Sequence, residues 1–98
     1  MFAYTQDVPI GRELYGRISA AIGEEPLEGL LVHIVVEREN GQLRYIDVWE
    51  SKEAYALAMD TRIHPAVDVA FGGSRPEGEP TSQPLTVVEL MGSAVPAA

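Results

Sequence analysis

Hydrophobic and polar residues alternate along this 98-residue chain with two different periods, one typical of strands and one typical of helices. Residues 2–8, FAYTQDV, alternate with a period of two and predict a first strand. After Pro9 an aliphatic residue recurs every four positions, which predicts a helix that buries one stripe and ends at Gly23. The members of that stripe are Ile10, Leu14, Ile18 and Ile22.

The middle of the chain predicts a β-hairpin followed by a second helix. Residues 30–50, LLVHIVVERENGQLRYIDVWE, contain two β-rich runs joined around Asn40-Gly41. Ser51 is a suitable N-cap for the helix that follows. That helix must stop or kink at His64-Pro65, because proline lacks the N–H that continues the hydrogen-bond ladder.

The last quarter of the chain predicts a loop, a strand and a tail. Residues 72–84, GGSRPEGEPTSQP, are rich in Gly, Pro and Ser, which is typical of a mobile surface loop. Residues 85–91, LTVVELM, predict the fourth strand, and residues 92–98 predict a loose tail.

The resulting order, β-α-β-β-α-β, predicts a single α+β domain over residues 1–98 with the ferredoxin-like arrangement. Such a domain has a four-stranded antiparallel sheet with two helices on one face. The strands carry too many apolar residues for the other face to meet water, so we expect a second copy of the sheet to cover it. The expected assembly is therefore a homodimer.

The hairpin register decides which side chains share a sheet face, because a slip of one residue exchanges the faces. A two-residue Asn40-Gly41 loop would separate His33 from Asp47. A type I turn with Gly41 as a G1 bulge would instead pair Arg38 with Gln42 and place His33 opposite Asp47.

The bulged register is favoured because it gathers the aliphatic residues on one face, where we expect them to pack against the helices. These residues are Val32, Ile34, Ile46 and Val48. The opposite face then holds Leu31, His33, Val35, Tyr45, Asp47 and Trp49.

The second face is typical of a small-molecule site. Asp47 would hold the His33 imidazole in one tautomer, so His33 could accept or donate a proton near neutral pH. Tyr45 and Trp49 offer aromatic walls for a ligand. The alternative is that His33 and Asp47 satisfy each other as a structural pair inside a dimer interface, with Trp49 as packing.

The composition argues against several classes of binding partner. A net charge of −8 and a pI near 4.5 argue against nucleic acid and anionic membranes. The chain has no cysteine, so neither a disulfide nor a thiolate metal site is possible. Its two histidines have no clustered carboxylates beside them, so we expect no metal site and no cofactor. No signal peptide or spanning segment is recognisable, so the cytoplasm is the expected location.

Three stretches carry a family resemblance: Gly29-Leu30-Leu31 followed by His33, the run DVWES at residues 47–51, and RIHP at residues 62–65. With them the chain resembles small actinobacterial proteins of the dimeric α/β-barrel superfamily, close to the antibiotic biosynthesis monooxygenase group. The resemblance implies a homodimer whose two sheets close into a barrel. It also implies a cofactor-independent monooxygenase-like activity on an aromatic or polycyclic small molecule.

Two hypotheses follow from these residues. In the first, the chain is such an enzyme, with His33 as proton acceptor, Asp47 as its orienting partner, and Tyr45 and Trp49 as substrate walls. In the second, it is a non-enzymatic ligand-binding or stress-associated homodimer, and His33-Asp47 is a structural pair. Whether the chain is an enzyme at all is left open by the sequence.

Overall fold

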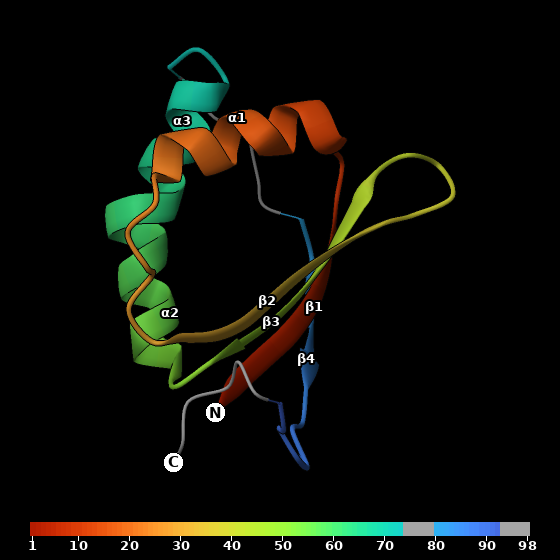
Figure 1. The fold of residues 1–98 in the computed structure, drawn as a ribbon, viewed down its shortest axis with the longest axis vertical. Helices are drawn as coiled ribbons and strands as arrows, with labels where there is room; N and C mark the ends of the chain where they lie inside the picture. The colour runs from red at the N-terminus through yellow and green to blue at the C-terminus, as the bar shows by residue number, and fades with distance from the viewer. Residues whose placement is uncertain (74–79, 93–98) are drawn as a thin grey trace.

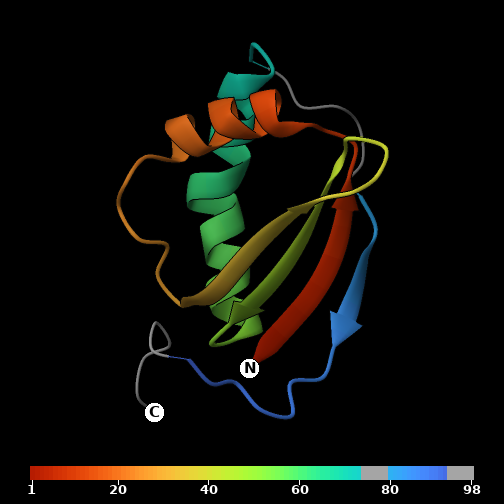
Figure 2. The ribbon, with the colours of Figure 1, turned by 45° about the vertical axis from the view of Figure 1, so that its right-hand side comes forward.

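The computed structural model describes residues 1–73 and 80–92 and contains a four-stranded antiparallel sheet with its helices on one side (Figure 1, Figure 2). The strands follow the order β2-β3-β1-β4, so the predicted α+β class is confirmed and the arrangement is compatible with the ferredoxin-like fold. The elements are β1 (Phe2–Val8), α1 (Arg12–Ile22), β2 (Leu30–Glu37), β3 (Leu43–Trp49), α2 (Lys52–Ala58), the π-helix η1 (Met59–Ile63), α3 (His64–Ala70) and β4 (Ser82–Leu85).

The hairpin between β2 and β3 has the bulged register that the sequence favours. The Arg38 N–H donates to Gln42 O at 2.8 Å, and the Gly41 N–H donates to Arg38 O at 2.9 Å. Gly41 has a φ of +82°, the left-handed conformation that a G1 bulge requires and that glycine adopts without strain. His33 therefore lies directly opposite Asp47, as predicted.

The expectation that the aliphatic face packs against the helices is wrong. Tyr15 of α1 contacts His33, and Tyr55 of α2 contacts Trp49, so the face with His33, Asp47 and Trp49 is the one that the helices cover. We call it the inner face, and we call the opposite one the outer face. Aromatic residues suit the inner face because their rings are large enough to fill the space between the sheet and the helices. Short aliphatic side chains would not reach across it.

The outer face is aliphatic and partly open. Its residues on the three longer strands include Ala3, Val32, Ile34, Val36, Ile46 and Val48. Ile34 is 45% exposed, and Val36 and Leu85 of the same face are also exposed. The helix side of the sheet is thus closed by the chain itself, whereas part of the outer face meets solvent in one copy.

The second helical segment neither stops nor kinks sharply at His64-Pro65, but widens into a π-helical turn. The His64 N–H donates to Met59 O, five residues back, before α3 begins with Pro65 in its first turn. A wider turn suits a proline that has no N–H for the preceding ladder. At the other end, Ser51 caps α2 as predicted, by accepting from the Ala54 N–H at 3.0 Å.

The first helix begins later, and the last strand earlier, than the sequence pattern indicates. Helix α1 starts at Arg12 rather than after Pro9, because Ile10 O instead accepts from the Leu43 N–H of β3. Strand β4 is Ser82–Leu85, not residues 85–91. Pro84 is tolerated there because β4 is an edge strand. The rest of the predicted mobile loop and tail, residues 74–79 and 93–98, lies outside the described residues.

Within residues 1–73 and 80–92, no helix has both the length and the apolar character needed to cross a bilayer.

Candidate functional site

The centre of the candidate site is a histidine-carboxylate pair on adjacent strands. His33 of β2 and Asp47 of β3 are register partners, and the His33 Nδ1 is hydrogen-bonded to the Asp47 Oδ1. Asp47 is 4% exposed, whereas 32% of the His33 side chain is exposed. Since a carboxylate only accepts, the imidazole donates its Nδ1–H, and in the neutral ring Nε2 is left as an acceptor.

That acceptor has a partner that the sequence does not predict. Tyr15, from the middle of α1, places its hydroxyl 2.9 Å from the His33 Nε2. With Nε2 as acceptor, the Tyr15 O–H donates. Tyr15, His33 and Asp47 therefore form a chain of two hydrogen bonds that runs from helix α1 through β2 to the buried carboxylate on β3.

Tyr45 completes a small ring cluster around the imidazole. It lies on β3, two residues before Asp47, and its ring centroid is 5.5 Å from that of His33 and 5.8 Å from that of Tyr15. The Tyr15 and His33 centroids are 6.2 Å apart. Each of these rings is only partly buried, so the cluster has a polar, reachable side.

Trp49 lies further along the same face, in the dry core. It is 1% exposed and packs with Tyr4 and Ala58, with the Tyr55 ring centroid 5.8 Å away. Its indole Nε1 is buried and has no hydrogen-bond partner within normal distance among residues 1–73 and 80–92. The structure thus places Trp49 at the closed end of the inner face, and its expected role as a substrate wall stays a prediction.

Tyr4 of β1 lies opposite Asp47 on the other side of β3. Tyr4 is 6% exposed, and burial raises its pKa, with the charge of Asp47 and a hydrogen bond to that carboxylate acting in the same direction. The Trp49 indole acts on Tyr4 in the opposite sense and lowers its pKa. Asp47 therefore accepts from His33 on one neighbouring strand and faces Tyr4 on the other.

The tyrosines around the carboxylate all keep their protons. Burial raises the pKa of Tyr15, and the charge of Asp47 raises it further. Burial also raises the pKa of Tyr45, followed by its interactions with Tyr15 and Asp47. A phenolate beside Asp47 would place two negative charges together on a partly dry face, so these hydroxyls act as hydrogen-bond donors and not as bases.

The reachable end of the site lies beside an ion pair. Arg12, one turn before Tyr15 on α1, donates to both carboxylate oxygens of Glu37 at 2.8 and 3.0 Å. At the other end of α1, Arg62 donates to the carbonyls of Ile22, Glu25 and Pro26 at 2.9–3.0 Å. These contacts fix both ends of the helix that carries Tyr15.

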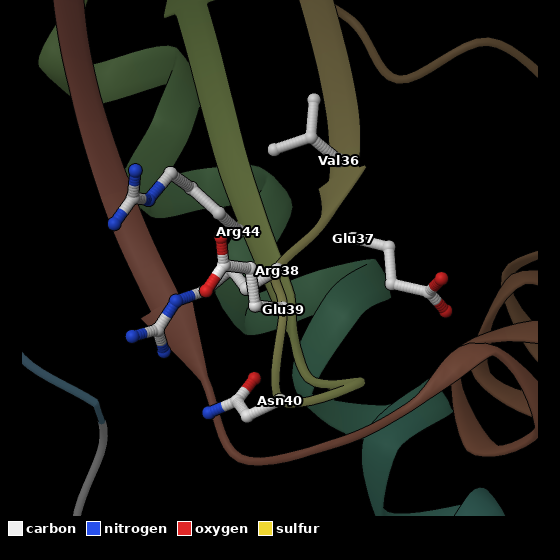
Figure 3. Close-up of a pocket in the computed structure, with 6 residues that line it drawn as sticks. All are labelled: Val36, Glu37, Arg38, Glu39, Asn40 and Arg44. Atoms are coloured by element: carbon white, nitrogen blue, oxygen red, sulfur yellow. The ribbon is translucent and has the colours of Figure 1, made fainter.

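A concave region lies at the hairpin tip, away from His33. It is an open depression of about 540 Å³ lined by residues 36–40 and Arg44. Figure 3 shows Arg38 and Arg44 on one side of the hairpin and Glu37 pointing to the other. The Arg44 guanidinium donates to Asp7 at 2.6 Å and lowers the pKa of that carboxyl. Because Glu37, Arg38 and Arg44 are paired with other charges and the depression is wide open, we assign it no ligand.

Of the four site residues predicted from the sequence, the structure brings His33, Asp47 and Tyr45 together and places Trp49 in the adjoining core. It adds Tyr15 and Tyr4. Tyr15 had a weak signal, since it lies beside Leu14 and three residues before Ile18 on the helix stripe. Tyr4 alternates with Phe2 on β1, but its alignment with Asp47 depends on the pairing of β1 with β3, which spacing does not reveal.

Comparison with known proteins gives no family: no protein-family model matches the chain, and no curated protein matches it. In the part of the chain that the structure describes, no three His, Asp or Glu side chains lie close enough together to hold a metal ion.

The raised pKa of the tyrosines predicts a loss of stability in alkali. Above pH 10 the unfolded chain loses phenol protons that Tyr4, Tyr15 and Tyr45 retain when folded, so the free energy of unfolding falls as pH rises. Tyr4, which is buried, contributes about 1.4 kcal/mol per pH unit once the unfolded phenol is ionised, and the more exposed Tyr15 and Tyr45 contribute less. Urea unfolding followed by Trp49 fluorescence between pH 9 and 11 measures the slope.

The matched variant is Tyr4→Phe, which keeps the buried ring and removes one titrating hydroxyl. It should make the decline shallower by about 1.4 kcal/mol per pH unit. Tyrosinate absorbance of the folded protein that rises fully near pH 10, as for exposed phenols, would contradict the assignment.

Proposed function

We propose that the chain is a small proton-transfer enzyme of the cofactor-independent monooxygenase type, acting on a hydroxylated aromatic molecule. The observation that carries the proposal is the chain from Tyr15 through His33 to Asp47. It presents an imidazole nitrogen as an acceptor at the partly exposed end of a buried carboxylate. Such an arrangement is suited to removing a proton from a weak acid near neutral pH.

The chemistry that this site supports starts with the substrate's hydroxyl. His33 Nε2 takes the proton, and Asp47 stabilises the imidazolium that forms. The resulting phenolate is electron-rich, and a ring carbon adds molecular oxygen to form a hydroperoxide anion. That anion takes the proton from His33, and loss of water leaves a quinone. One phenol and one O₂ thus give one quinone and one water.

The same family resemblance supports a homodimer, which we include in the proposal. On the outer face, Ile34, Val36 and Leu85 are exposed in one copy, beside the partly buried Val32 and Ile46. A second sheet laid on it would remove those side chains from water. The inner face, with the His33 site, would remain between each sheet and its own helices.

A second candidate, a non-enzymatic ligand-binding or stress-associated homodimer, is favoured by one feature. Both His33 nitrogens already have partners within the chain. In that case the pair is structural, and removing His33 chiefly lowers stability by leaving Asp47 buried and alone.

Replacement of His33 separates the two candidates. We expect His33→Gln to lower oxygen consumption with hydroxylated naphthalenes and anthracenes by at least about 100-fold, because general-base catalysis contributes that much or more. His64→Gln, which replaces the other histidine of the chain, should retain turnover. The readouts are an oxygen electrode and product absorbance, with circular dichroism to confirm folding. Equal activity in His33→Gln and the parent protein would exclude His33 as the base.

The homodimer is tested on the outer face. Ile34→Glu places a charge among its aliphatic residues and should reduce the mass found by sedimentation equilibrium from two copies to one. Leu57→Glu is the matched control, because Leu57 is 61% exposed on α2, away from the sheet. If the parent protein sediments as a single copy at micromolar concentration, the dimer is wrong.

A further inference from the structure

We infer that Tyr15 is a gate that determines which ligands the site accepts: its phenol occupies the ligand's own position at the His33 Nε2. A small aromatic compound with an acidic hydroxyl displaces it and donates to the same nitrogen. This inference rests on the proposed function. The recognised group of the ligand is an aromatic hydroxyl, and the side chain that competes with it is Tyr15.

The first observation is the nature of the partner. Nδ1 of His33 is committed to the buried Asp47, so Nε2 is the only ring nitrogen that a ligand can reach. That nitrogen is paired with a phenol at 2.9 Å. The Tyr15 hydroxyl therefore makes, within the chain, the same hydrogen bond to this imidazole that an aromatic hydroxyl of a ligand would make.

The second observation is where the hydrogen-bond chain meets solvent. Asp47 is buried, His33 is partly exposed, and the Tyr15-His33 hydrogen bond is exposed. A ligand thus approaches from the Tyr15 end. Two phenols cannot donate through the same lone pair of Nε2, so binding of the ligand requires Tyr15 to leave.

The third observation is that contacts other than those of Tyr15 hold the helix that bears it. Helix α1 packs against α3, is paired with β2 through Arg12 and Glu37, and is bound at its C-terminal end by Arg62. Rotation of the Tyr15 side chain breaks one hydrogen bond and its ring contacts with His33 and Tyr45. The gate is therefore a single side chain and not a domain motion.

The acidity of the competing hydroxyl sets the preference. The pKa of Tyr15 is raised by burial and by Asp47, so Tyr15 is a weaker acid than a free phenol. A more acidic hydroxyl shares its proton more strongly with the imidazole. Ligands should therefore bind in order of hydroxyl acidity, and an aromatic ether of the same shape should bind least.

The experiment measures dissociation constants of 4-cyanophenol, phenol and anisole at pH 7 by NMR titration of the His33 ring signals. The parent protein should bind 4-cyanophenol more tightly than phenol, and phenol more tightly than anisole. Tyr15→Phe should bind both phenols about two- to tenfold more tightly, the equivalent of one net hydrogen bond, and anisole equally. Tyr55→Phe, which removes a phenol hydroxyl from the ring cluster around Trp49, is the control and should change none of these.

Three results would overturn the gate. They are weaker binding of phenols by Tyr15→Phe, binding of anisole as tight as that of phenol, and no binding of either phenol to either protein. If Tyr15→Phe folds poorly, Tyr15→Leu serves as the second variant with the same expected order. Failure of the proposed function is distinguished from failure of the gate by oxygen consumption, because the gate predicts binding whether or not turnover occurs.

Discussion

Burial of the Asp47 carboxylate is the constraint around which the inner face of this protein is arranged. An ionised carboxylate removed from water costs several kcal/mol unless donors surround it. Asp47 lies on the central part of the sheet, with β2 on one side and β1 on the other: His33 of β2 donates to it, and Tyr4 of β1 faces it. Burial raises the pKa of Tyr15 and Tyr45 nearby, and the charge of Asp47 raises it further.

The strand that carries this carboxylate also serves the opposite surface. Along β3 the side chains alternate between Tyr45, Asp47 and Trp49 on the inner face and aliphatic residues on the outer face. A strand has a period of two, so a polar site and an apolar surface can share it without mixing. This separation would let a partner cover the outer face while the His33 site stays on the other side of the sheet.

Local chemistry in the sequence predicts a large part of this arrangement. Asn40-Gly41 predicts the bulged turn, and the turn determines that His33 meets Asp47. The sequence does not reveal which face the helices cover, because both faces of the hairpin are apolar enough to be buried. We expected the aliphatic strand residues to face the helices. Instead, Tyr15 and Tyr55 of the helices pack against aromatic side chains of the sheet. Tyr4 and Tyr15 join the site through pairings distant in sequence, which periodicity does not encode.

Proton transfer at this site depends on Asp47 holding His33 as the Nδ1-protonated tautomer, in which Nε2 is an acceptor for a hydroxyl proton. The most direct test is ¹⁵N NMR of the imidazole in protein labelled at histidine, at a pH where the ring is neutral. We expect a protonated Nδ1 and an unprotonated Nε2 for His33, and loss of that preference in Asp47→Leu. A ring protonated at Nε2 in the parent protein would contradict the account, because the nitrogen facing Tyr15 would then be a donor and could not take a proton from a ligand.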